Sequence, residues 1–270
     1  MNPSVHPHHR RHLRPAVRRV LTVTAVACIA VGGASFVLHS RSAVPAASAT
    51  STSSASAASE AESSLLTARQ AQAILDDPRM VLVNHTNKMP DDHTFTTKAC
   101  GSATAVNKTL QTVACNAFLE LQKAAAAENV TVWMQSGYRS VSYQTNLYEK
   151  KTNYYKQQGY DDAKAKEMAA AIVNPPGYSE HNCGLAADLN SPEHTGLDEG
   201  FENTAAFRWL CQHAGEYGFI LRYPKGAEEK TEITYEPWHW RYVGVENAAK
   251  INASGLCFED YIAALQQIAG

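Results

Sequence analysis

Beyond residue 100, apolar residues recur at intervals of three and four, which is the spacing of one face of a helix. The clearest series contains Val106, Leu110, Val113, Ala117 and Leu121. The proline pair in "NPPG" cannot continue a helix and ends the third of the segments with a helical pattern. The predicted helices are Ala103–Glu128, Val141–Gln158, Asp161–Ile172, Thr204–Tyr217 and Phe258–Ile268.

Short runs of β-branched and aromatic residues lie between these helices and predict strands. The predicted strands are "VTVWMQ" at Val130–Gln135, Leu185–Leu189, "FILRY" at Phe219–Tyr223 and "WHWRYVG" at Trp238–Gly244. Helices and strands do not alternate regularly, as they would in a parallel sheet with crossover helices. The pattern therefore predicts an α+β fold in which helices flank a small, mainly antiparallel sheet.

An uncharged, mostly apolar run of 19 residues, Val20–Leu38, is long enough to cross a bilayer as a helix. Arginines are concentrated on its N-terminal side, which favours a cytoplasmic location for residues 1–19 and an exported body. A cleaved signal peptide is an alternative, because small residues occur at Val31–Ala34 within the run and at Ala47–Ala49 after it, and cleavage would make the protein secreted. A lipoprotein site at Cys28 is a third alternative. We expect a single-pass anchor in the cell membrane, with the body outside the cell.

Residues 39–64 are rich in Ser, Ala and Thr and lack the bulky apolar side chains that form a core, so they predict a flexible linker. Six of the 24 basic residues fall in the first fifty positions, which hold no acidic residue, so the remainder has 18 basic and 26 acidic side chains. An acidic body argues against nucleic acid as a partner. We expect one folded domain over residues 65–270, and a monomer.

Five of the six cysteines lie outside the apolar run, namely Cys100, Cys115, Cys183, Cys211 and Cys257. Because five is odd, at least one thiol is free or pairs between chains. Export permits disulfides, and we predict that Cys183 pairs with Cys211. No spacing is of the CxxC type, so a structural zinc knuckle is not expected.

Three polar clusters carry candidate chemistry: "SGYRSVSYQ" at 136–144, "SEHNCGLAAD" at 179–188 and "YEPWHWRY" at 235–242. The second and third offer His181, Asp188 and His239, and two imidazoles with one carboxylate are a sufficient protein shell for a catalytic zinc ion. Glu236, three residues before His239, is placed to transfer protons. Structural roles are the alternatives: Arg139 in a salt bridge, and Trp238, Trp240 and Tyr242 in sheet packing. A thiol nucleophile at Cys183, two residues from His181, is a further alternative.

The pattern SxHxxGxAxD followed by ExxH resembles the zinc D-alanyl-D-alanine carboxypeptidases of the VanY type, in the lysostaphin/D-Ala-D-Ala metallopeptidase group. Here the pattern is formed by Ser179, His181, Gly184, Ala186 and Asp188, then by Glu236 and His239. "SGYRS", "LVNHTNKMP" at 82–90 and "YGFILRYP" at 217–224 are similar to the same group. The resemblance spans about Val81–Gly244. Cys183 and the "TEI" at 231–233 depart from the family's usual Thr or Ser and "TGI".

The resemblance implies a Hedgehog/D,D-peptidase-like fold with a single zinc ion held by His181, Asp188 and His239. It implies Glu236 as general base and acid, and Arg139 as the group that stabilises the oxyanion or binds the substrate carboxylate. It further implies Gln144, Ser179, Tyr138 and Trp238 as residues that contact the substrate.

The activity that the resemblance implies is removal of the terminal D-alanine from peptidoglycan stem peptides. An L,D-carboxypeptidase acting on tetrapeptide stems uses the same ligands and stays open as an alternative. So do an endopeptidase that cuts within the stem and, from another class, a non-catalytic wall-binding domain on the same fold.

Overall fold

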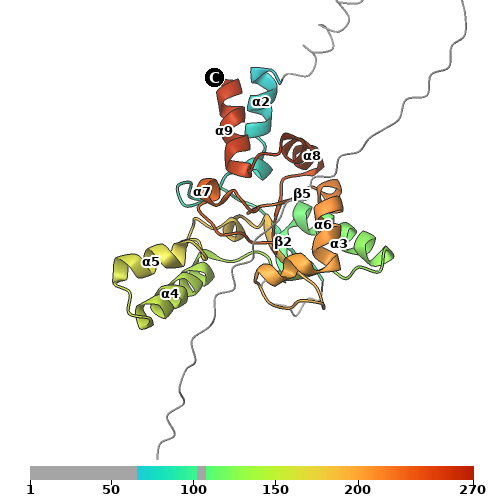
Figure 1. The fold of residues 1–270 in the computed structure, drawn as a ribbon. Coiled ribbons are helices and arrows are strands. Elements are labelled where there is room, and N and C mark those ends of the chain that lie inside the picture. Colours follow the sequence, from blue (N-terminus) through green and yellow to red (C-terminus); the bar gives the residue numbers. More distant parts are fainter. Residues whose placement is uncertain (1–65, 102–107) are drawn as a thin grey trace, which may run out of the picture. The chain divides into compact units, whose positions relative to one another are not determined.

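The computed structural model describes residues 66–101 and 108–270 (Figure 1). Its centre is a four-stranded antiparallel sheet with the strand order β3-β4-β6-β5. The strands are β3 (Trp133–Ser136), β4 (Ala186–Asn190), β6 (His239–Tyr242) and β5 (Phe219–Leu221). All five residues of β4 and all four of β6 are buried, because these two strands lie between neighbours in the middle of the sheet. The predicted antiparallel α+β architecture is therefore confirmed.

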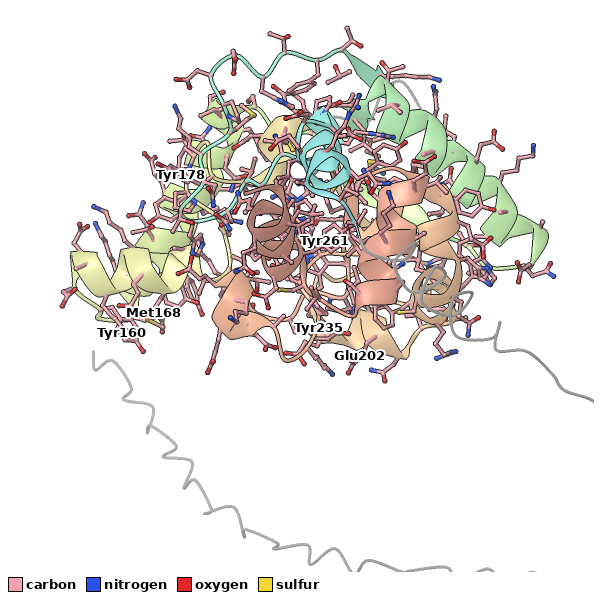
Figure 2. The ribbon with its side chains drawn as sticks, turned by 90° about the horizontal axis from the view of Figure 1, so that it is seen from above. Tyr160, Met168, Tyr178, Glu202, Tyr235 and Tyr261 are labelled. Atoms are coloured by element: carbon pink, nitrogen blue, oxygen red, sulfur yellow. A yellow bond between two sulfur atoms is a disulfide. The ribbon has the colours of Figure 1, made fainter. Side chains whose placement is uncertain are left out.

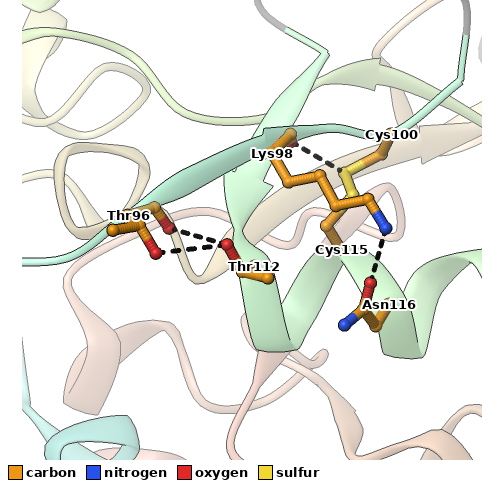
Figure 3. Close-up of a disulfide and its surroundings, with 6 residues drawn as sticks. All are labelled: Thr96, Lys98, Cys100, Thr112, Cys115 and Asn116. Carbon is orange, nitrogen blue, oxygen red and sulfur yellow. Dashed lines mark hydrogen bonds between the residues drawn. A yellow bond between two sulfur atoms is a disulfide. The ribbon is translucent and has the colours of Figure 1, made fainter.

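A second, two-stranded antiparallel sheet pairs β1 (Thr97–Ala99) with β2 (Thr109–Gln111). A disulfide between Cys100 and Cys115, whose Cα atoms are 5.5 Å apart, joins this hairpin to the following helix (Figure 3). The predicted pairing of Cys183 with Cys211 is wrong: within the described residues Cys183 is a buried free thiol, and Cys211 and Cys257 are also free.

The helices carry the labels of Figure 1. They are α2 (Ala68–Leu75), α3 (Thr112–Ala127), α4 (Val141–Gln157), α5 (Asp162–Ala170), α6 (Ala205–His213), α7 (Glu228–Thr231), α8 (Val245–Ser254) and α9 (Phe258–Ala269). Short 3₁₀ helices are η1 (Pro78–Met80), η2 (Glu180–Cys183), η3 (Glu199–Asn203) and η4 (Ala214–Tyr217). Side-chain caps begin several helices: Thr67 caps α2, Ser140 caps α4, Asp161 caps α5 and Thr204 caps α6.

The apolar residues form two clusters. One lies between the sheet and helices α3 and α6, and contains Phe118, Leu121, Leu189, Leu210 and Trp240. The other lies between β5 and helices α2, α8 and α9, and includes Ile220, Ile251, Phe258, Tyr261 and Leu265. Tyr261 of α9, a member of this second group, is labelled in Figure 2. Helices α2 and α9, the first and the last of the described residues, therefore pack beside each other next to the sheet.

Residues 103–107 of the predicted helix Ala103–Glu128 lie outside the described residues; residues 108–111 are not helical, and the described helix begins at Thr112. Leu110 belongs instead to β2, because its backbone pairs with Lys98, and Val113 is 42% exposed rather than on the buried face. That face carries Ala114, Cys115, Phe118, Leu121 and Ala125. Helices α2 and α8, the β1–β2 hairpin and α7 were not predicted. The other predicted helices and strands are confirmed, with ends that differ by a few residues; Thr204–Tyr217 divides into α6 and η4.

The predicted cytoplasmic segment, apolar anchor and Ser/Ala-rich linker lie outside the described residues, as does Cys28. Among residues 66–101 and 108–270, no helix combines the length and the apolar character that a membrane span requires.

Candidate active site

A cavity of about 260 Å³ opens over the sheet, where β4 and β6 meet the beginning of α4. Its wall combines polar and apolar side chains from the sheet, η2, α4 and the surrounding loops. The lining residues are Arg139, Gln144, Leu147, Ile172, Val173, Asn174, Ser179, His181, Asp188, Leu197, Tyr223, Ile233, Glu236, Trp238 and His239. The three sequence clusters therefore meet at one place.

Asp188 and His239 lie opposite each other in the antiparallel pair β4–β6. Directly opposed residues place their side chains on the same face of a sheet. His239 Nδ1 accordingly lies 3.4 Å from Asp188 Oδ1, and both side chains are buried. The strand register thus brings together two polar residues that are 51 positions apart.

His181 reaches the same point from η2. Gly184, at the C-terminal end of η2, has a φ of 71°, and a Cβ there would lie 3.0 Å from a ring carbon of Phe95. This position therefore favours glycine, and the chain turns tightly from η2 into β4. His181 Nδ1 donates a hydrogen bond to the carbonyl oxygen of Gly137 at 2.7 Å, which directs Nε2 towards Asp188 Oδ1 at 3.3 Å.

These three residues have the chemistry and spacing of a metal site. One ligand atom from each of His181, Asp188 and His239 lies within 4.8 Å of the other two. Atoms held at about 2.0–2.2 Å by one tetrahedral zinc ion lie about 3.3–3.6 Å from each other. The separations of 3.3 and 3.4 Å between Asp188 Oδ1 and the two imidazole nitrogens fall in this range. Two imidazoles and a carboxylate are also ligands that zinc prefers, so the residues fit the ion.

Glu236 is placed beside this group by a four-residue turn. The backbone N–H of His239 donates to the carbonyl oxygen of Glu236 at 3.1 Å, with Pro237 at the second position of the turn, where its fixed φ is favourable. Glu236 Oε2 consequently lies 3.3 Å from His239 Nδ1. The spacing ExxH thus follows from a local turn rather than from a helix.

The buried charges shift the acidities of the site. Burial raises the pKa of Glu236, and the nearby His239 opposes that shift only in part. Burial and the Arg139 guanidinium lower the pKa of His181 to about 4. Burial also disfavours the protonated form of His239, but Glu180 and Glu236 outweigh it and raise its pKa to about 9. For Asp188, burial is outweighed by His181 and Arg139, and its pKa is held below the usual range.

Arg139 adds a permanent positive charge to the wall of the cavity. Its Nη2 donates to Asp188 Oδ2, the oxygen that faces away from the two imidazoles, and its Nε donates to Ser136 Oγ at 3.0 Å. The guanidinium therefore orients the Asp188 carboxylate and also lines the space where a substrate would lie.

The structure brings three of the four predicted substrate contacts to the cavity: Gln144, Ser179 and Trp238. Gln144 Nε2 donates to the carbonyl oxygen of Asn174 at 2.7 Å, whereas its Oε1 is buried and has no partner among the described residues. Tyr138 does not line the cavity. Its ring packs edge-on against Phe95, with the ring centres 5.7 Å apart.

Cys183 does not have the environment of a nucleophile. Its thiol is buried and donates to the carbonyl oxygen of Glu180 at 2.9 Å, and burial raises its pKa. A reactive cysteine needs a lowered pKa and access to solvent, so the thiol alternative is not supported.

Sequence reasoning missed the layer of charge beneath the cavity, which contains Glu180, Arg222 and Arg241, all fully buried. Glu180 immediately precedes His181. Each arginine lies in or next to a strand that is otherwise apolar or aromatic. A charged residue within such a strand is the one sequence signal that points to a buried polar role.

Comparisons with known proteins agree with this site. Residues 107–245 match the family model VanY, described as D-alanyl-D-alanine carboxypeptidase. A D-alanyl-D-alanine carboxypeptidase of Enterococcus faecalis is 35% identical over 204 residues, which cover 74% of this chain and 71% of that relative.

Two solved structures share the fold. One is a mutant of the vancomycin-resistance D,D-pentapeptidase VanY in complex with Zn(II), with a TM-score of 0.60 and 34% identity, over 68% of this chain and 99% of the other. The second is the L,D-carboxypeptidase LdcB, with a TM-score of 0.60 and 31% identity, over 70% of this chain and 88% of the other. The family match, the related sequence and the antiparallel fold around a His/Asp/His cluster lead to one conclusion: the chain belongs to the VanY family of D-alanyl-D-alanine carboxypeptidases.

Proposed function

We propose that this protein is a zinc-dependent carboxypeptidase that removes the C-terminal D-alanine from peptidoglycan stem peptides. The observation that carries the proposal is the meeting of His181, Asp188 and His239 in one buried cluster, with Glu236 beside it. The VanY relative with Zn(II) supports zinc as the ion, and the family and the enterococcal relative support D-Ala-D-Ala as the substrate.

His181, Asp188 and His239 would hold the zinc ion, which would act as a Lewis acid on the scissile carbonyl and on water. Glu236 is buried next to the cluster, and burial raises the pKa of its carboxyl group. A carboxylate with a raised pKa is a better base than an exposed one. Glu236 would therefore take a proton from the attacking water and return it to the amine of the departing D-alanine.

Arg139 and Gln144 would hold the substrate. The planar guanidinium of Arg139 offers a fork of N–H donors that suits a carboxylate or a developing oxyanion. Gln144 Oε1 is buried and without a partner among the described residues, and would accept a peptide N–H of the substrate. An unpaired buried acceptor costs free energy, and a hydrogen bond from the ligand would remove that cost. Ser179 adds a polar side chain to the wall of the cavity, and Trp238 adds an apolar one.

The test uses the purified full-length chain, loaded with zinc, and synthetic pentapeptide and tetrapeptide stems. We expect mass spectrometry to show loss of one alanine from the pentapeptide, and no loss with Glu236→Gln. Because LdcB is also structurally similar, the tetrapeptide is the informative comparison. Cleavage of the tetrapeptide alone would replace the proposal by L,D-carboxypeptidase activity. Tight binding of both peptides without cleavage would favour a wall-binding domain.

We also propose that the catalytic body is exported and anchored by the apolar run Val20–Leu38 in the cell membrane. The arginine-rich segment before this run supports a cytoplasmic N-terminus. The disulfide between Cys100 and Cys115 supports an oxidising compartment outside the cytoplasm.

A further inference from the structure

Three charged side chains beneath the cavity are fully buried: Glu180, Arg222 and Arg241. Removing charges from water is costly, and a buried ion pair is often no more stable than apolar residues of the same size. Stability alone therefore does not explain why three charged residues are buried here. Their arrangement around His239 suggests a functional explanation.

The two arginines bind only one oxygen of Glu180. Arg222 Nε and Arg241 Nη1 donate to Oε1 at 2.8 and 2.6 Å. The other oxygen, Oε2, is buried without a hydrogen-bond partner among the described residues, and so is His239 Nε2. These two atoms face each other at 3.6 Å. A decrease of about 0.7 Å would make this contact an ordinary hydrogen bond.

This contact favours Nδ1 of His239 as the nitrogen that binds a metal. It acts against the carboxylates of Asp188 and Glu236, which lie 3.4 and 3.3 Å from Nδ1 and would otherwise attract the N–H to that side. A neutral imidazole carries one N–H, and its other nitrogen has the free electron pair that a metal needs. The Glu180 carboxylate can only accept, so it favours the N–H on Nε2 and the free pair on Nδ1. Nδ1 is the nitrogen that lies 3.4 Å from Asp188 Oδ1, on the side of the ligand cluster. Glu180 therefore holds the His239 ring in the tautomer and orientation that the site requires.

The same arginines connect Glu180 to the C-terminal helix. Arg222 Nη1 and Nη2 both donate to the carboxylate of Glu259 in α9. The ring of Phe258, also in α9, lies 5.2 Å from the Arg222 guanidinium and 5.1 Å from that of Arg241. Helix α9 lies outside residues 107–245, the part of the chain that matches the family model.

We propose that Glu180 is a positioning residue for the metal ligand His239, and that the Arg222–Glu259 pair makes α9 part of the support of the metal site. This inference rests on the proposed function, because it assumes a metal ion at His181, Asp188 and His239. Glu180 does not touch the substrate; it acts through His239.

The experiment compares three variants of the full-length chain with wild type: Glu180→Gln, Glu259→Gln and the control Glu216→Gln. In Glu180→Gln, the amide oxygen can still accept from both arginines, but the amide N–H₂ turns a donor towards His239 Nε2 and so favours the wrong tautomer. Glu216 is a matched control, since its carboxylate likewise lies beside a histidine, 3.0 Å from Nδ1 of His213. This pair is at the surface and away from the cavity.

Zinc affinity is measured by competition with a fluorescent chelator, and the metal-free proteins are melted to check that each variant folds. We expect Glu180→Gln to raise the zinc Kd about 10- to 100-fold. Glu259→Gln should raise it less, and Glu216→Gln should leave it unchanged. In the zinc-loaded protein, ¹⁵N NMR of the histidine rings should show a protonated Nε2 at His239 in wild type and a weakened or lost signal in Glu180→Gln.

A Glu180→Gln protein that folds, binds zinc as tightly as the control and keeps the His239 signal would overturn the role of Glu180. If that variant does not fold, Glu259→Gln provides the test. A zinc Kd equal to that of the control would overturn the proposal that α9 supports the metal site. Wild-type protein that binds no zinc would instead reject the proposed function. The two failures are therefore distinguishable.

Discussion

Arg139 donates to the oxygen of Asp188 that faces away from His181 and His239, so one carboxylate joins the cationic wall of the cavity to the candidate metal ligands. Asp188 Oδ1 is left for the imidazole side, and Oδ2 is held by the guanidinium. Because each oxygen of Asp188 has its own partners, Arg139 and the two histidines, which come from different segments, are held in one site.

Glu236→Gln should lower kcat by about 10²–10⁴-fold, the usual loss for a positioned proton-transfer group. The amide keeps the shape of the side chain and leaves His181, Asp188 and His239 in place, so zinc content and substrate binding should stay near wild type. Steady-state kinetics and metal analysis check both points. A variant with most of its activity would remove Glu236 from the mechanism; one that lost its zinc would make Glu236 part of the metal site.

Removal of zinc by a chelator should abolish hydrolysis and lower the Tm, because bound metal stabilises only the folded state. His239→Ala should have the same two effects without a chelator. Cys183→Ser serves as the comparison, since the buried Cys183 thiol takes no part in the proposed chemistry. Activity that survives exhaustive chelation but is destroyed by a thiol alkylator would favour a cysteine nucleophile instead.

Cys115→Ser should destabilise the protein by about 3 kcal/mol, the value expected for a cross-link that closes a loop of this length. The disulfide to Cys100 spans a sequence separation of 15 and holds the β1–β2 hairpin against α3. Urea unfolding with and without reductant measures the effect, with Cys211→Ser as the control that breaks no disulfide. Equal stability of Cys115→Ser and oxidised wild type would show that the bond contributes little.

Asp77→Asn should lower stability at neutral pH by less than about 1 kcal/mol, because asparagine still caps η1 but the ion pair with Arg79 is lost. Burial alone would raise the pKa of Asp77, but the hydrogen bonds and charge of Arg79 outweigh it and lower that pKa below its usual 3.8. The stabilisation is therefore present above the unfolded-state pKa and disappears as pH falls through the lowered folded-state pKa.

Melting curves of wild type and Asp77→Asn should therefore converge as the pH falls below the ordinary aspartate pKa and then through the lowered pKa of Asp77 in the folded state. The exposed Asp92→Asn is the control, and should show no such convergence. A difference between wild type and Asp77→Asn that stayed constant down to the acid limit would exclude the ion pair as its cause.

Protease added outside intact cells should cut the chain from Ser40 onward and spare residues 1–19, because the apolar run would place them on opposite sides of the membrane. Mapping of the fragments by mass spectrometry checks the topology. A mature N-terminus at Ala34 or Thr50 would show that the apolar run is removed and that the protein is secreted.

The sequence by itself determined the local parts of the site. The ExxH spacing is a turn around Pro237, and the HxxG spacing is a short 3₁₀ helix that ends at a glycine with positive φ. Both depend on neighbouring residues and on backbone preferences, which a sequence displays directly. The main helices and the central strands were predictable for the same reason, since their periodicity reports which face is buried.

Only the tertiary structure decided which residues from distant segments come into contact. Cys115 bonds to Cys100, whereas Cys183 and Cys211 are free thiols within the described residues, and the Tyr138 ring packs against Phe95 instead of lining the cavity. The partners of Glu180 come from the end of β5, from β6 and, through Arg222, from α9. Such contacts are set by strand register and helix packing. The physical reason is that a disulfide, an ion pair or a metal shell requires atoms within a few ångströms of each other, and local sequence preferences do not fix distances between residues far apart in the chain.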